Sequence, residues 1–187
     1  MNELSKAIED IIGLFDSLGL RYAIMGGIAV RVYGIPRATY DVDFTAAVSR
    51  NTLPDLFQRV QSLGYSVPDP YLQGWLDQVG GMPLVKFRLF LAGRQIDVDV
   101  FLAESPYQSS LLDRRRRSKL NGIEAWLVSP EDLVLLKLLA NRPRDIADVG
   151  DVLFMQGQLD IKYMREWASQ VGVSERLETA LRGHYSE

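Results

Sequence analysis

The order of apolar and polar residues predicts alternating helices and strands along the chain. In the first segment Leu4, Ile8 and Ile11 recur at helical spacing, and Gly19 is a natural stop. Other segments repeat this spacing, whereas short apolar runs and strict alternation indicate strands. The predicted helices cover residues 3–18, 28–33, 51–63, 106–117, 133–140, 144–156, 161–171 and 174–183. The predicted strands cover residues 22–25, 39–46, 84–91, 95–102 and 123–128.

Residues 64–83 interrupt this pattern. They contain four glycines and three prolines, which predicts an irregular excursion from the compact core. Its aromatic side chains could have a functional role, by stacking on a base or by forming a lid. Alternatively, they provide the ordinary packing of a long loop. These aromatic residues are Tyr65, Tyr71 and Trp75.

The chain of 187 residues is long enough for one compact domain with a helical appendage. All the predicted strands lie in the first 128 residues. Ser129-Pro130-Glu131-Asp132 has the features of a helix start: a hydroxyl cap, Pro at the first position and acids in the first turn. We therefore expect a mixed α+β protein. Its core would span residues 1–128, with a C-terminal helical region over residues 129–187 packed on it.

The residue types present exclude several chemistries. The chain has no cysteine, which rules out disulfides, thiolate metal sites and a cysteine nucleophile. Its one histidine, His184, argues against a Ser-His-Asp triad or a multi-histidine zinc site. The net charge of −3 predicts that any sequence-independent binding of nucleic acid is weak or confined to a basic patch. No apolar run reaches the ~18 residues that cross a bilayer and the start lacks a signal-peptide core, so we expect no membrane contact and a cytoplasmic location.

Two Asp-x-Asp motifs lie on predicted strands. Asp41 and Asp43 alternate with apolar residues, so their carboxylates share one face of the strand, about 6–7 Å apart. Asp97 and Asp99 repeat the arrangement. Like charges this close raise each other's pKa unless a cation neutralises them, and Mg²⁺ prefers such oxygen ligands. Side by side, the two strands would supply carboxylates for one or two metal ions and an in-line phosphoryl displacement. Alternatively, each pair is only the solvated face of a half-buried strand.

Gly26-Gly27 lies between a predicted strand and a predicted helix. Glycines there let the backbone pass close to a ligand, and a helix N-terminus offers free amides to a phosphate. A plain turn is the alternative interpretation. The pair matches neither Walker A nor GxGxxG, so P-loop and Rossmann folds lack their fingerprints.

The order and spacing of these motifs resemble a known signature. Gly26-Gly27, thirteen intervening residues, Asp41-Val42-Asp43 and a later apolar-Asp-apolar strand resemble the nucleotidyltransferases of the DNA polymerase-β-like superfamily. More narrowly, residues 20–155 resemble small prokaryotic nucleotidyltransferases related to abortive-infection (AbiEii-like) toxins. The additional residues that carry this narrower resemblance are Ile28, Ala29, Gly34, Arg37, Thr39, Ser129-Pro130-Glu131-Asp132-Leu133, Lys137, Arg142, Asp145 and Asp148. The resemblance implies the nucleotidyltransferase fold, with a central mixed β-sheet flanked by helices.

The resemblance also implies a ligand set for metal. Asp41 and Asp43 would hold Mg²⁺, and the third carboxylate would come from the strand at 95–102. Asp99 fits the family spacing slightly better than Asp97, and both stay candidates. The third aspartate could help deprotonate the acceptor.

The remaining implied site residues concern the nucleotide. Gly26 and Gly27 would bind the triphosphate of an NTP. Lys137 would approach its phosphates, with Asp145 as a polar partner, and it interrupts an apolar run in which an unpaired ammonium is costly to bury. Further nucleotide-binding candidates are Arg37, Thr39 and Arg142.

These assignments predict a Mg²⁺-dependent nucleotidyltransferase that moves a nucleoside monophosphate from an NTP to a hydroxyl of a tRNA or a protein. The toxin-like resemblance further implies a toxin-antitoxin pair with an antitoxin protein as partner. One alternative is a catalytically silent module of the same fold that binds a nucleotide or a partner. Another is modification of a small molecule, such as aminoglycoside adenylylation.

A dense basic cluster at residues 114–117, with Lys119, stands out in this acidic chain. It is either a solvated helix face whose arginine stems cover apolar neighbours, or a landing site for an RNA acceptor or an acidic partner.

Overall fold

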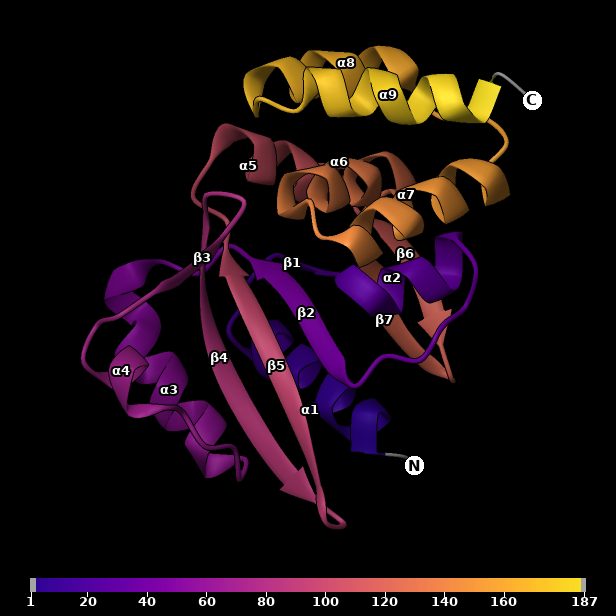
Figure 1. Cartoon of the computed structure of the whole chain (residues 1–187). Coiled ribbons are helices and arrows are strands. Elements are labelled where there is room, and N and C mark those ends of the chain that lie inside the picture. The colour runs from indigo at the N-terminus through magenta and orange to yellow at the C-terminus, as the bar shows by residue number, and fades with distance from the viewer. Residues whose placement is uncertain (1–2, 186–187) are drawn as a thin grey trace.

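A seven-stranded mixed β-sheet forms the centre of the computed structural model, which describes residues 3–185 and the side chains of residues 3–183 (Figure 1). The strand order is β3-β4-β5-β2-β1-β7-β6. Strand β1 pairs with β7 and β2 with β5 in parallel, and the other neighbours are antiparallel. The bounds are Tyr22–Met25 (β1), Asp41–Ala46 (β2), Asp77–Val79 (β3), Met82–Leu91 (β4), Arg94–Leu102 (β5), Arg116–Leu120 (β6) and Ile123–Leu127 (β7).

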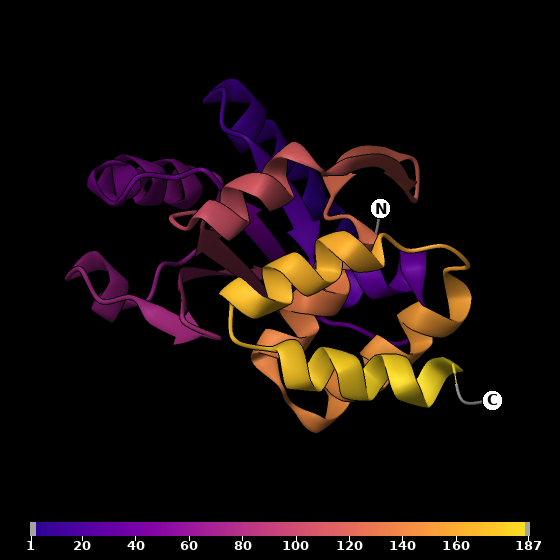
Figure 2. The same cartoon turned by 90° about the horizontal axis from the view of Figure 1, so that it is seen from above.

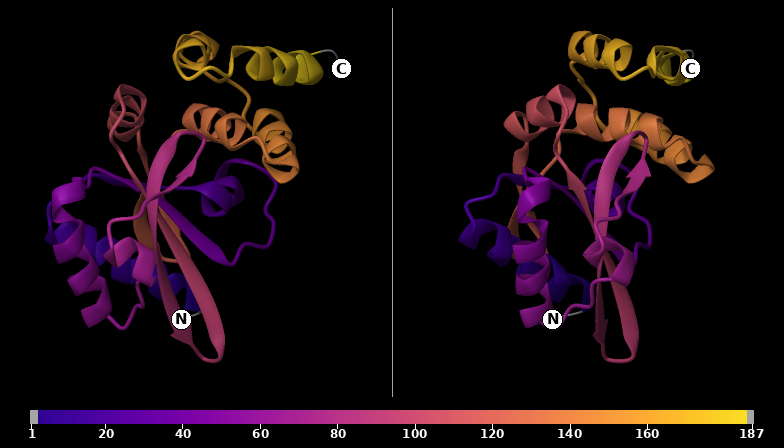
Figure 3. Two further views of the ribbon diagram at one scale, coloured as in Figure 1. Left: turned by 60° about the vertical axis from the view of Figure 1, so that its left-hand side comes forward. Right: turned by 90° about the vertical axis from the view of Figure 1, so that its left-hand side faces the viewer.

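Helices cover the sheet in layers. They are α1 (Glu3–Ser17), α2 (Gly26–Tyr33), α3 (Leu53–Ser62), α4 (Asp69–Leu72), α5 (Pro106–Asp113), α6 (Pro130–Ala140), α7 (Pro143–Met155), α8 (Ile161–Gln170) and α9 (Ser174–Tyr185), with a 3₁₀ turn at Arg50–Thr52. Helices α1 and α3 pack on one face, while α2 lies on the other with α6 and α7 across the end of the sheet (Figure 3). Seen from above, α8 and α9 form an outer layer over α6 and α7 (Figure 2).

The alternation along β2 decides which residues face each layer. Val42 and Phe44 are fully buried on the face that α1 covers, where the rings of Phe15 and Phe44 meet edge-on at 5.5 Å. Asp41 and Asp43 therefore point to the opposite face, as the period of two predicts. The apolar side of β5 is buried in the same way. The mixed fold class predicted from the sequence is confirmed.

One predicted helix is wrong in its second half. The helix expected over 106–117 ends at Asp113, and the following residues form β6 in a hairpin with β7. Asn121 and Gly122 both take positive φ at the turn, a pairing that favours a tight hairpin. The basic cluster is thus not a helix face: the guanidinium groups of Arg115 and Arg117 both lie over the Trp126 ring.

The segment 64–83 is more ordered than expected, since it contains α4 and β3. Tyr65 and Tyr71 are buried, and the hydroxyl of Tyr71 donates a 2.8 Å hydrogen bond to Asp77. Ordinary packing is therefore the correct interpretation for these two tyrosines. Trp75 stays largely exposed, and its indole N–H donates to Asp77.

Buried apolar residues of the sheet and of α6–α9 form one continuous core. The division into residues 1–128 and 129–187 stays a prediction. Within the described residues, no helix has both the length and the apolar character to span a membrane.

Candidate active site

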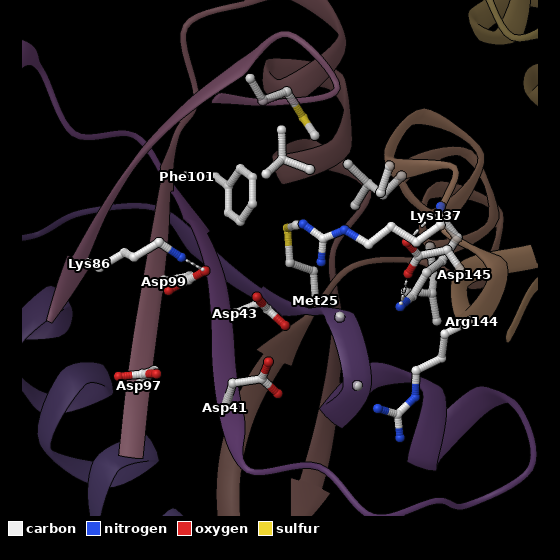
Figure 4. A pocket seen from close by; sticks show the side chains of 18 of the residues that line it. Met25, Asp41, Asp43, Lys86, Asp97, Asp99, Phe101, Lys137, Arg144 and Asp145 are labelled. Atoms are coloured by element: carbon white, nitrogen blue, oxygen red, sulfur yellow. Dashed lines mark hydrogen bonds and ion pairs between the residues drawn. The ribbon is translucent and has the colours of Figure 1, made fainter. Parts of the chain in front are cut away.

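Four aspartates lie on one face of the neighbouring strands β2 and β5. The parallel register places Asp41 opposite Asp97 and Asp43 opposite Asp99. Adjacent strands are about 4.8 Å apart, so the two Asp-x-Asp motifs form one acidic surface, as the sequence predicts. This surface lines a cavity of about 320 Å³, within the range of small-ligand sites. Figure 4 shows these acids on one side of the cavity and Lys137 and Asp145 on the other.

The two glycines bring the start of α2 against the acidic surface. Gly26 and Gly27 form the first residues of α2, two residues earlier than predicted. A Cβ on Gly26 would lie 1.9 Å from Oδ2 of Asp43, and one on Gly27 would lie 2.6 Å from Oγ1 of Thr39. Gly26 also has a φ of +62°, which other residues rarely adopt. Glycine is therefore favoured at position 26 by its backbone conformation and by Asp43, whereas at position 27 a side chain would displace Thr39.

The Asp43 carboxyl group has the most perturbed pKa of the acidic surface. Burial, followed by the charges of Asp41 and Asp99, raises its pKa to about 7. Asp41 is exposed and accepts a 2.6 Å hydrogen bond from the hydroxyl of Thr39, which is buried. Thr39 thus orients one of the two carboxylates of the first motif.

A lysine that sequence reasoning missed contacts the second motif. Lys86 on β4 lies directly opposite Asp99, and its Nζ donates a 2.6 Å hydrogen bond to Oδ2 of that residue. Burial raises the pKa of Asp99 and Lys86 opposes the rise. Oδ1 of Asp99 is buried without a hydrogen-bond partner. The sequence could have indicated this pair, because a hairpin at Ala92-Gly93 sets the register that brings Lys86 opposite Asp99.

The acidic surface has the donor chemistry for a divalent cation. Carboxylate oxygens are the ligands that Mg²⁺ prefers, and Oδ1 of Asp99 is buried without a protein partner. Among the side chains of residues 3–183, no three acids, histidines or cysteines stand in a preformed metal cluster. Lys86 donates to Oδ2 of Asp99, so this hydrogen bond fixes how the Asp99 carboxylate is oriented toward Asp41 and Asp43.

The opposite wall is an ion-pair network that joins α6 and α7. An unpaired ammonium would be costly to bury in the apolar run around Lys137, as expected from the sequence. Lys137 is paired, because its Nζ lies 2.8 Å from Asp145 and 2.7 Å from Asp148. Arg37 binds both oxygens of Asp148, at 2.7 and 2.8 Å. Burial would raise the pKa of Asp148, but these hydrogen bonds outweigh it and lower the pKa.

The rim next to this network is cationic. The backbone N–H of Arg142 donates to Asp145, and the Arg142 side chain borders the cavity. Arg144, which the sequence did not single out, also borders the cavity and donates to the carbonyl of Ala38. The rest of the lining is apolar and comes from segments far apart in the sequence. These residues are Met25, Val79, Met82, Phe101, Leu133, Leu136 and Ala140.

Comparison with family models identifies the chain. Residues 2–182 match the model described as nucleotidyltransferase of unknown function (DUF6036). The chain belongs to this family. A comparison with curated proteins gives no match.

Solved structures agree with this nucleotidyltransferase assignment at the level of the fold. An antigenic nucleotidyltransferase-like protein from Paracoccidioides brasiliensis superposes with a TM-score of 0.54 at 20% identity, over 97% of this chain and 96% of that chain. ANT(2″)-Ia in complex with adenylyl-2″-tobramycin gives 0.57 at 15% identity, over 90% and 98%. The nucleotidyltransferase part of the sequence resemblance is confirmed, and the AbiEii-like subtype is not.

Proposed function

We propose that this nucleotidyltransferase uses Mg²⁺ to transfer a nucleoside monophosphate from an NTP to a hydroxyl group. The observation that supports the proposal most strongly is the register of β2 and β5, which sets Asp41 and Asp43 beside Asp97 and Asp99. The glycine-containing start of α2 lies directly against these acids and lines the same cavity.

In this proposal Asp41 and Asp43 hold the metal, which would supply positive charge to phosphate oxygens during an in-line displacement, and Asp99 is the third acid of the site. Asp99 is preferred over Asp97 because it is more buried, with a side chain 17% exposed against 45%, and lies opposite Asp43. The unpartnered Oδ1 of Asp99 would accept the proton of the attacking hydroxyl. The hydroxyl oxygen then bonds to the α-phosphorus while the bond to pyrophosphate breaks.

The triphosphate would lie between the start of α2 and the cationic rim. Backbone amides at Gly26 and Gly27 and the helix dipole favour anionic oxygens. Arg142 and Arg144 border the same cavity and carry charge for the departing pyrophosphate. Lys137 is a candidate phosphate partner, held in place by Asp145 and Asp148.

For the acceptor, we propose a macromolecular hydroxyl, on a tRNA or a protein, and a toxin role with an antitoxin partner. The support is the toxin-like pattern that runs from Ser129 to Asp148. The fold is also that of ANT(2″)-Ia, a structure solved with adenylyl-2″-tobramycin, so an aminoglycoside hydroxyl is the competing acceptor.

The test is incubation of the protein and Mg²⁺ with each α-labelled NTP in separate reactions that contain total tRNA, cell lysate or tobramycin. We expect label on tRNA or on a protein with α-labelled NTP, and none with γ-labelled NTP, because pyrophosphate leaves. Label on tobramycin alone would replace the macromolecular acceptor. Absence of label in every reaction would contradict the proposed transfer.

One observation favours the silent alternative, which is that Lys86 already neutralises Asp99. A silent module would bind an NTP in the same cavity and label no acceptor. Equilibrium binding of a labelled NTP, measured alongside the transfer reactions, separates the two functions.

A further inference from the structure

Charged residues form two cross-strand rows on the face of the sheet that carries the acids. In the inner row, Lys86 of β4 lies opposite Asp99 of β5, which lies opposite Asp43 of β2. In the outer row, Arg88, Asp97 and Asp41 occupy the equivalent places. Each row therefore places two acids on neighbouring strands and one cation on the third.

The two cations differ in how tightly they hold their acids. Lys86 Nζ lies 2.6 Å from Asp99, and the two side chains are 32% and 17% exposed. Arg88 lies 3.5 Å from Asp97, and both are nearly half exposed. An ion pair shielded from water interacts more strongly than an exposed one. Lys86 is thus a fixed part of the site, whereas Arg88 belongs to its solvated margin.

The geometry points to Lys86 as a built-in cation that replaces a second divalent ion. We propose that the site holds one divalent ion, on Asp41 and Asp43, and that Lys86 occupies the second cation position at Asp99. This inference rests on the proposed function, because it concerns the metal complement of that same site.

Charge balance and space both support this assignment. Asp41, Asp43 and Asp99 carry three negative charges, which one divalent ion and one ammonium neutralise. Lys86 already donates to Oδ2 of Asp99 at 2.6 Å, so a divalent ion bound to that oxygen would lie close to the ammonium. Repulsion between the two cations disfavours a second divalent ion there while Lys86 stays in place. Lys86 is therefore a positioning residue, which leaves Oδ1 of Asp99 facing no protein partner.

The test counts bound ions directly. Mn²⁺, as a replacement for Mg²⁺, is titrated into the full chain with a non-hydrolysable α,β-methylene NTP, and free Mn²⁺ is measured by electron paramagnetic resonance. We expect one Mn²⁺ per ternary complex for the unaltered chain and two for Lys86→Met, which removes the charge and keeps the length. Lys86→Gln, which retains a hydrogen-bond donor, should also give two because the charge is what excludes the ion. Arg88→Met is the matched control on the same strand face and should give one.

Two Mn²⁺ ions in the unaltered chain would overturn the role of Lys86, as would one ion in both Lys86 variants with unchanged thermal unfolding. Asp43→Asn separates this failure from that of the proposed function. If the unaltered chain binds two ions and Asp43→Asn loses them, only the Lys86 inference fails. If the unaltered chain binds none, the metal-dependent function fails with it.

Discussion

At the scale of single residues, Gly26 is constrained twice, by its backbone conformation and by the carboxylate of Asp43. Gly26→Ala would place a Cβ 1.9 Å from Oδ2 of Asp43 in addition to the strain of a φ of +62°. We expect a loss of about 2–4 kcal/mol in the free energy of unfolding and weaker Mn²⁺ binding, because Asp43 must move.

Gly19→Ala is the matched control for this substitution. Gly19 has a φ of +63° and nothing within 4 Å of an added Cβ, so it carries the strain alone, about 1–2 kcal/mol. Chemical denaturation of both variants measures the difference. Equal losses would mean that the contact with Asp43 does not explain Gly26.

The Asp43 carboxyl group makes the stability of the metal-free protein depend on pH. Its pKa is raised to about 7 from an ordinary value of 3.8, so the folded chain binds the proton more tightly than the unfolded chain. Stability from this group is complete below pH ~4 and is lost as the pH rises through about 7.

Asp43→Asn removes this titration, since asparagine stays neutral. In a chelator at pH 8 we expect the variant to be more stable by about 4 kcal/mol, a rise of about 8–16 °C in the Tm, and the gain to vanish near pH 4. Thermal unfolding across this pH range measures it. A variant less stable than the unaltered chain at pH 8 would mean that the carboxylate is not penalised in the fold.

At the scale of elements, the network of Arg37, Lys137, Asp145 and Asp148 fixes α7 against α6 and against the loop before β2. Asp148 is nearly inaccessible and binds two cations, so Asp148→Ala leaves Arg37 without its carboxylate partner and Lys137 with Asp145 alone. We expect a loss of about 3–5 kcal/mol. Because the pKa of Asp148 is lowered, this contribution is present above pH ~4 and disappears as the pH falls further.

Glu178→Ala is the control for that loss. Glu178 pairs with Arg165 at 2.7 Å on the surface of α8 and α9, where solvent screens the ion pair, so we expect its loss to change the stability little. Urea denaturation at pH 7 compares the two variants. Similar losses in the free energy of unfolding for both variants would show that burial of the network does not increase its contribution to stability.

At the scale of the whole molecule, local patterns predicted most elements and the face of each acid. The alternation around Asp41 and Asp99 was sufficient because one buried face fixes a strand's orientation. The helix expected over 106–117 failed because the Asn121-Gly122 turn and the stacking of Arg115 on Trp126 favour a hairpin instead.

The site was predicted less completely than the fold. The acids and glycines form short motifs, so sequence alone could place them in one cavity. Lys86 and Arg144 were missed because their roles follow from a cross-strand register and from a contact with Ala38 more than 100 residues away. Partners of Lys137 were predicted only in part, since Asp145 was foreseen and the link through Asp148 to Arg37 was not.

The central claim is that Asp41 and Asp43 hold the ion that makes nucleotidyl transfer possible. The most direct measurement is the rate of label transfer from an α-labelled NTP for the unaltered chain, Asp41→Asn, Asp43→Asn and the outer-margin variant Asp97→Asn. We predict a loss of about 10²-fold or more for the first two substitutions, with folding retained, and a change of less than about 10-fold for Asp97→Asn. Transfer by Asp43→Asn at the rate of the unaltered chain would contradict the account.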